Sequence, residues 1–249
     1  SPVRMSADVA TASERKKLSL ALRAERGLII AGNGIDQSRF ILDLAAKLNW
    51  PVFADPRSNC RVAPESSHGA TIVTCADVMM RHQPTAESLK PTVVIRVGDP
   101  PVSKVVNQWL ARCGAEQIAV TQQPTLIDPD KIVTTHIVGS FNELFMEMSR
   151  GTQVKPESEW ISEWKLRERK ARTALDSQFS NSNQLTEPLS AVTVSESLEP
   201  GSNLVVSSSM PVRDLEWFAP ARDGVRVFSN RGVNGIDGVV STAVGVALS

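Results

Sequence analysis

The stretch GLIIAGNGIDQSRFILDLAAKLNWPVFAD, residues 27–55, decides the fold class. Residues 27–31 are a short apolar run that predicts a buried strand, and the GNG of residues 32–34 predicts the turn that follows it. Apolar side chains then recur at helical spacing through residues 40–48, and residues 52–54 are apolar again. A strand, a helix and a strand in this order form a βαβ unit, which predicts a parallel sheet in an α/β domain.

The same pattern continues on both sides of this unit. Residues 13–26 predict a helix that leads into the first strand, and residues 102–113 predict a later helix. Ser140 and Glu143 have the spacing of a capping box for a helix that runs to Met148. Residues 1–150 therefore predict one Rossmann-like central α/β domain. Its further strands are predicted at residues 92–97, 117–121 and 132–138.

Residues 151–186 are predicted to be a helix and a linker. Within residues 159–175, an apolar stripe of Trp160, Trp164, Ala171 and Leu175 predicts a helix with one buried face. Its charges fit an exposed face with pairs four residues apart, Glu163 with Arg167 and Glu168 with Arg172, rather than a nucleic-acid patch. The polar residues 177–186 are predicted to be the linker at a domain boundary.

A second α/β pattern starts after this linker, in residues 187–249. It predicts helices over residues 188–198, from Ser209 and from Gly235, and strands over residues 204–207 and 225–228. The last eleven residues have the composition of a helix interior without a stop signal, and position 1 is not Met. We therefore expect the second domain to be truncated and both ends of the chain to be cut.

Composition excludes several classes of protein. Lys and Arg together number 27, as do Asp and Glu, so the net charge of zero offers no field for a nucleic-acid partner. No apolar run is long enough for a membrane span, and residues 1–15 have no apolar segment typical of a secretory signal. Cys60, Cys75 and Cys113 are an odd, widely spaced set, which favours a reducing compartment and buried thiols over structural zinc.

The first glycine-rich turn invites a dinucleotide-binding interpretation. Gly32 and Gly34 follow a strand, and Asp55 lies about 20 residues downstream, where an acid would bind a ribose. The third glycine of that fingerprint is absent, because Gln37 stands in its place. We therefore favour a structural turn.

A second candidate site lies in residues 204–238. The strand predicted at 204–207 runs into Ser208 and Ser209, with Ser209 predicted as the N-cap of a helix, an arrangement that favours anion binding. Arg213 lies one turn along this helix and suits a carboxylate or phosphate. The next strand leads into a glycine-rich loop that contains Arg231, so these residues are predicted to share one sheet edge.

These residues carry a resemblance to a known family. The stretches SSMPVRD (residues 208–214) and SNRGVNGIDGVVSTAVG (229–245) resemble the start of the diphosphate-binding domain of 2-succinyl-5-enolpyruvyl-6-hydroxy-3-cyclohexene-1-carboxylate synthases. The stretch VIRVGDPPVSKVVNQW (94–109) resembles the central domain of that family. These are transferases of menaquinone and phylloquinone biosynthesis that use thiamine diphosphate and magnesium.

The resemblance implies a function and a set of site residues. Such an enzyme decarboxylates 2-oxoglutarate and adds the succinyl-semialdehyde unit to isochorismate. By motif match, Ser209, Arg213, Arg231 and Lys104 would bind the dicarboxylate substrates. The cofactor would contact Ser208, Gly235 and Ile236, whereas the Mg²⁺ ligands would lie outside this chain. Val105 follows Lys104 at a position where the family often has an arginine, so a second cation there is not expected.

The family further implies a homo-oligomer in the cytoplasm, or in a plastid in photosynthetic eukaryotes, and an isolated chain without activity. An alternative from another class is a non-catalytic α/β module that binds a nucleotide or a regulatory anion. Arg57 and Arg61, which lie near Asp55, are the cations that such a module would use.

Overall fold

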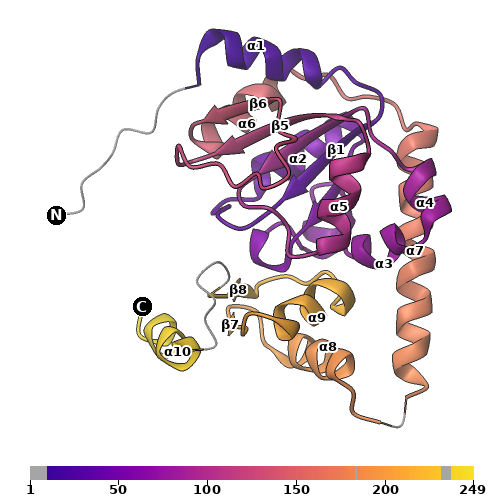
Figure 1. Cartoon of the computed structure of the whole chain (residues 1–249), viewed down its shortest axis with the longest axis vertical. Coiled ribbons are helices and arrows are strands. Elements are labelled where there is room, and N and C mark those ends of the chain that lie inside the picture. The colour runs from indigo at the N-terminus through magenta and orange to yellow at the C-terminus, as the bar shows by residue number, and fades with distance from the viewer. Residues whose placement is uncertain (1–9, 183, 231–236) are drawn as a thin grey trace.

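A sheet of six parallel strands forms the centre of the computed structural model, which describes residues 10–182, 184–230 and 237–249. The order is β3-β2-β1-β4-β5-β6, so the chain winds outward from β1 in one direction and then from β4 in the other. Figure 1 shows the sheet among its helices, with β1, β5 and β6 labelled. This is the doubly wound order of Rossmann folds, and it confirms the predicted α/β class. The strands are β1 (Gly27–Ala31), β2 (Pro51–Ala54), β3 (Thr71–Val73), β4 (Val93–Val97), β5 (Glu116–Thr121) and β6 (Thr135–Val138).

Helices cover both faces of this sheet, and alternate residues of each strand serve the two cores. In β1, Ile29 belongs to one buried cluster and Ile30 to the other. The first cluster lies under α1 (Ala12–Ala21), α2 (Arg39–Leu48) and α6 (Phe141–Gly151). The second lies under α3 (Ala76–Arg81), α4 (Gln83–Ser88), α5 (Lys104–Arg112) and α7 (Glu159–Ser180).

The helix ends follow from local residue chemistry. The side chain of Ser103 accepts a hydrogen bond from the Val106 N–H at 3.0 Å and starts α5 directly after the β4 loop. Ser140 caps α6 in the same way, through the Glu143 N–H at 3.4 Å. Helix α2 ends at Asn49, whose φ of 50° is left-handed, and the chain turns into β2.

Residues 56–90 contain secondary-structure elements that were not predicted from the sequence. It contains two 3₁₀ turns, Pro56–Ser58 and Pro64–Ser66, followed by β3, α3 and α4. Strand β3 has three residues and each of the two helices has six, so none spans enough residues to show a clear hydrophobic period. This stretch adds the outer strand on the β2 side of the sheet.

Helix α7 is anchored by its tryptophans, as the apolar stripe predicts. Trp164 is fully buried, and its ring packs edge-on against Phe53, Trp109 and Trp160 at centroid distances of 5.1, 6.4 and 5.5 Å. The indole N–H of Trp160 donates to the Gly27 carbonyl at 2.9 Å and so reaches the start of β1.

Two details of α7 differ from the prediction. The helix runs on to Ser180, so the first four residues of the segment predicted as a linker are helical. The predicted pair of Glu163 and Arg167 is present at 2.6 Å, but Glu168 does not pair with Arg172. Its carboxylate instead accepts hydrogen bonds from the N–H groups of Thr74 and Cys75, because α7 crosses the end of β3 there.

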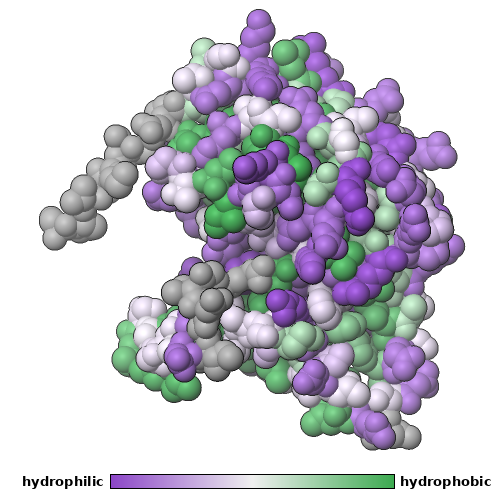
Figure 2. Space-filling view, in the orientation of Figure 1, coloured by the Kyte–Doolittle hydropathy of each residue, from purple (hydrophilic) through white to green (hydrophobic). Residues whose placement is uncertain are grey.

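The second α/β pattern is also present. It comprises α8 (Glu187–Ser197), β7 (Asn203–Val205), α9 (Met210–Phe218), β8 (Arg226–Phe228) and α10 (Val239–Ala247). Strands β7 and β8 pair in parallel, with Leu204 opposite Val227. Helix α10 begins after Gly238, while the predicted start at Gly235 lies outside the described residues. Apolar side chains of α10 lie on the surface at the lower left of Figure 2, with Val240 and Leu248 78% and 84% exposed.

The three cysteines are buried and free, which confirms their prediction as core residues. Burial raises the pKa of the Cys60 and Cys75 thiols to about 12, so neither is a nucleophile at neutral pH. Among the described helices, none combines the length and the apolar character that a membrane span requires.

We predict that Trp164→Ala lowers the free energy of unfolding by about 3–5 kcal/mol, because it leaves a cavity among three aromatic rings. Urea titration followed by tryptophan fluorescence would measure the change. Val154→Ala, at a site that is 73% exposed, is the control and should stay within about 0.5 kcal/mol of the parent chain. A loss for Trp164→Ala as small as that of the control would contradict the anchoring role of α7.

Candidate functional site

A cavity of about 580 Å³ lies at the carboxyl edge of the central sheet, where ligands bind in open α/β folds. Its walls come from the loop between β4 and α5, from the loop after β5, and from α9 of the second unit. Lys104 and Arg213, two of the residues implied by the resemblance, both line it. They come from different α/β units, and the fold brings them to one cavity.

Lys104 is held at this edge by the start of α5. It is the first residue of that helix, and its side chain is exposed. The preceding residue, Ser103, is fully buried, and its hydroxyl donates to the Asp77 carboxylate at 2.5 Å. The backbone at Lys104 is therefore fixed on one side by the cap of α5 and on the other by α3.

Arg213 lies in the first turn of α9 and is half-buried. The chain reaches this helix from β7 through Ser209, whose φ of 75° is a left-handed conformation that a non-glycine residue rarely adopts. Val212 and Leu215 of the same helix are buried and hold it in the second unit. The turn before α9 is thus strained at the point where the helix presents Arg213 to the cavity.

The cations around the cavity fall into two kinds. The Arg57 guanidinium binds Asp55 at 2.9 Å, and the Arg96 guanidinium binds Asp128 at 3.2 Å, so both are neutralised within the protein. Lys104 and Arg213 form no ion pair with any residue in the described ranges. Asp99 and Asp130 of the same lining are likewise in no ion pair within the described ranges, so Lys104 and Arg213 are the two points on this cavity at which the anionic groups of a ligand would be held.

Hydroxyl groups gather at the carboxyl ends of β7 and β8. The Oγ atoms of Ser208 and Ser229 are buried, and neither has a hydrogen-bond partner among the described residues. Ser209 takes the N-cap position of α9 as predicted, but its side chain makes no capping bond because of its unusual backbone conformation. The two orphaned hydroxyls fit a ligand with hydrogen-bonding oxygens, such as a diphosphate.

Three predicted site residues cannot be placed. Arg231, Gly235 and Ile236 lie outside the described residues. In the described ranges there is also no group of three or more His, Cys, Asp or Glu side chains arranged to hold a metal ion.

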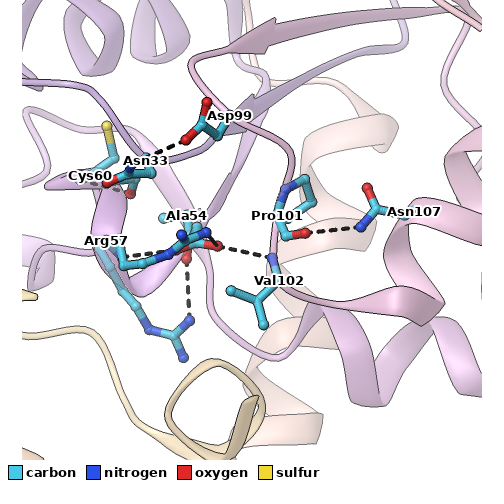
Figure 3. A network of polar contacts seen from close by, with 11 residues as sticks. Asn33, Ala54, Arg57, Cys60, Asp99, Pro101, Val102 and Asn107 are labelled. Atoms are coloured by element: carbon cyan, nitrogen blue, oxygen red, sulfur yellow. Dashed lines mark hydrogen bonds and ion pairs between the residues drawn. The ribbon is translucent and has the colours of Figure 1, made fainter. Parts of the chain in front are cut away.

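The turns after β1 and β4 pack directly against each other beside the crevice that holds a dinucleotide in Rossmann folds. It lies between β1 and β4, where the Asp99 N–H donates to the Asn33 carbonyl at 3.0 Å and the side chains of the two residues meet at 3.1 Å (Figure 3). A Cβ on Gly32 would lie 1.6 Å from the Asp99 carbonyl oxygen, and one on Gly98 would lie 2.2 Å from that of Asn33. The glycines serve close packing of two turns, which supports the structural interpretation.

The alternative function, binding of a nucleotide or a regulatory anion, would use Arg57 and Arg61, but both guanidinium groups already bind other groups of the protein. Arg57 is 5% exposed and binds Asp55 through its Nε and Nη2 atoms, while Arg61 is 8% exposed. The Arg61 guanidinium binds backbone carbonyls of Ala54 and Thr74, each at 3.2 Å. Neither side chain is free to take a regulatory anion without losing these bonds.

Sequence reasoning missed the role of Glu216. This residue of α9 is buried, and its Oε2 has no partner among the described residues. Burial, and next the nearby Asp55 carboxylate, raise the pKa of Glu216 to about 8, while the guanidinium of Arg61 opposes the shift. The sequence alone offers no signal for it, because the packing partners lie over a hundred positions away.

Comparison with known proteins places this architecture in a family. A family model described as "Middle domain of thiamine pyrophosphate" matches residues 3–206. Curated relatives named 2-succinyl-5-enolpyruvyl-6-hydroxy-3-cyclohexene-1-carboxylate synthase include the protein of Myxococcus xanthus, 36% identical over 89% of this chain and 38% of its own length. The Bacillus cytotoxicus protein of the same name is 33% identical over 93% of this chain and 39% of its own.

A third relative of that name, from Bacillus velezensis, is 34% identical over 89% of this chain and 39% of its own length. The chain thus spans about two fifths of the length of the curated relatives it matches. These alignments cover about nine tenths of this chain, so the part left out at either end is short. They therefore include both Lys104 and Arg213, one on each wall of the cavity.

We predict that the free energy of unfolding falls as pH rises from about 5 toward about 8, because folded Glu216 binds its proton more tightly than the unfolded chain does. One such group contributes up to about 1.4 kcal/mol per pH unit. Urea titrations at pH 5.5, 6.5 and 7.5 would measure the slope. Glu216→Gln should flatten it, whereas Glu163→Gln on the surface of α7 should not. Equal slopes for Glu216→Gln and the parent chain would contradict this assignment.

Proposed function

Because the chain belongs to the family of thiamine pyrophosphate enzyme middle domains and is homologous to the 2-succinyl-5-enolpyruvyl-6-hydroxy-3-cyclohexene-1-carboxylate synthases, we propose that it is part of such a synthase. The proposed reaction decarboxylates 2-oxoglutarate and adds the remaining four-carbon unit to isochorismate. The observation that carries this proposal is the pair of unneutralised cations, Lys104 and Arg213, on one cavity at the carboxyl edge of the sheet.

The proposed role of these two residues is to bind substrate carboxylates. Both substrates are dicarboxylates, and each carboxylate that leaves water needs charged hydrogen bonds in return. Arg213 offers a planar fork that suits a bidentate contact, while Lys104 offers a compact charge from the opposite wall. Arg96 and Arg57 are held in place by their own carboxylate partners and are not assigned a substrate carboxylate. Ser209 and Arg231 remain proposed members of the same site.

Thiamine diphosphate is the proposed cofactor, and it supplies a carbon centre that stores the electron pair released on decarboxylation. The buried Ser208 and Ser229 hydroxyls fit its diphosphate, because both are unpartnered in the described structure and lie at the ends of neighbouring parallel strands. Gly235 and Ile236 are further proposed cofactor contacts. The protein ligands of the proposed Mg²⁺ would lie outside this chain. A homo-oligomer likewise stays a prediction.

The proposal is tested in a chimera, in which this chain replaces the matching segment of the Myxococcus xanthus protein. With thiamine diphosphate, Mg²⁺, 2-oxoglutarate and isochorismate, we expect the chimera to turn over. Lys104→Met and Arg213→Met should each lower kcat/KM by roughly 10–100-fold, the value of one hydrogen bond to a charged group. Lys170→Met removes an exposed cation of α7 and is the matched control. Losses for the two site variants no larger than for Lys170→Met would overturn the proposal.

We also expect the 249-residue chain on its own to show no synthase turnover with the same substrates, cofactor and metal. The reason is that it spans only about two fifths of the length of its relatives. A coupled assay for carbon dioxide release would detect even slow decarboxylation. Turnover above the buffer control, lost again in Arg213→Met, would contradict this prediction and show that the 249-residue chain suffices for the reaction.

A further inference from the structure

Arg61 is buried at the junction between the two α/β units. It follows the 3₁₀ turn after β2, and its guanidinium forms no ion pair in the part of the chain that the structure describes. Instead it donates to four backbone carbonyls. Two belong to the central domain, where Nη1 binds Ala54 and Nη2 binds Thr74, each at 3.2 Å. The other two lie at the end of α9, where Nη2 binds the carbonyls of Glu216, at 3.0 Å, and Ala219.

A buried cation stabilises carbonyl groups at the end of a helix, and two of these four carbonyl groups lie there. The last carbonyls of a helix have no partner within the helix and carry the negative end of its dipole. Glu216 lies in the last turn of α9, and Ala219 is its C-cap. Ala54 and Thr74 stand at the carboxyl ends of β2 and β3. One guanidinium therefore joins two strand ends of the central sheet to the end of a helix in the other unit.

Neighbouring contacts hold the chain around this guanidinium. The backbone N–H of Arg222 donates to the Arg61 carbonyl at 3.0 Å. Asp223 accepts from the Ala63 N–H at 2.9 Å and from the Ser66 hydroxyl at 2.6 Å. All of these bonds lie between the loop after β2 and the segment after α9. The C-terminal end of α9 is thus fixed to the central domain, whereas Arg213 projects from its N-terminal half.

We propose that Arg61 is a positioning residue for Arg213. By holding the end of α9 against the ends of β2 and β3, its guanidinium fixes the helix that carries Arg213 relative to α5, which carries Lys104. This inference rests on the proposed function, because it matters for catalysis only if Lys104 and Arg213 bind one substrate. The geometry itself does not depend on a ligand, so it is testable without one.

The test measures the distance between α5 and α9 by double electron–electron resonance in the 249-residue chain. Spin labels are attached at Gln108→Cys and Met210→Cys, which are exposed and leave Lys104 and Arg213 intact. The three native cysteines are buried and are not expected to react. The parent chain should give one narrow distance population. Arg61→Met should lose it and give a broad distribution, while Arg61→Lys, with one ammonium for four carbonyls, should give an intermediate width.

Arg222→Met is the control, because its guanidinium binds the Ser195 carbonyl of α8 within the second unit and bonds neither α9 nor the central domain among the described residues. It should keep the narrow population. Amide exchange in β1 and β4 should be unchanged in all variants, which separates loss of positioning from general unfolding. If Arg61→Met fails to fold, Arg61→Lys decides. A parent-like distribution for the tested Arg61 variant, or equal broadening in Arg222→Met, would overturn the proposal. Neither outcome would affect the kinetic test of Lys104 and Arg213.

Discussion

The Asp55 carboxylate, buried at the end of β2, accepts hydrogen bonds from the backbone and side chain of Arg57 and from the Val102 N–H at 3.0 Å. Val102 belongs to the loop that starts α5, so this one acid ties that loop to β2. Six residues further on, Arg61 ties α9 to the same strand end. The segment of residues 55–61 thus holds both α5 and α9, the helices that carry Lys104 and Arg213. Of this segment, Arg57 lines the cavity itself.

The central domain could be predicted because its strands are short apolar runs and its helices show clear periodicity, as in residues 27–55. The β3 segment could not, since its elements have three to six residues each. Lys104 and Arg213 could be named only from motif resemblance, which does not say that they meet. The bonds of Arg61 join positions more than 150 residues apart. No spacing pattern in a single sequence carries contacts of that kind, because they arise from tertiary packing.

Although the net charge of the chain is zero, the charged side chains that line the cavity differ in whether they are paired. Two of the four cations that line the cavity form ion pairs within the protein, Arg57 with Asp55 and Arg96 with Asp128. Asn33 packs against Asp99 beside the position used by nucleotides in related folds. Lys104 and Arg213, which line the cavity from α5 and α9, form no ion pair within the described ranges. The cavity lies at the sheet edge where Rossmann folds bind their ligands, and residues of both α/β units line it.

Helix α7 runs along the side of the molecule, from the central sheet to the second unit (Figure 1). Its 22 residues correspond to about 33 Å, and both ends are held. Near its start Trp160 and Trp164 are buried in the central core, whereas further along Arg172 donates to the Phe218 carbonyl at 2.9 Å and Phe179 packs edge-on against the Phe218 ring. Helix α7 is therefore a rigid spacer between the two units. Because both ends of this helix are packed, its length sets the separation of the two units along its axis.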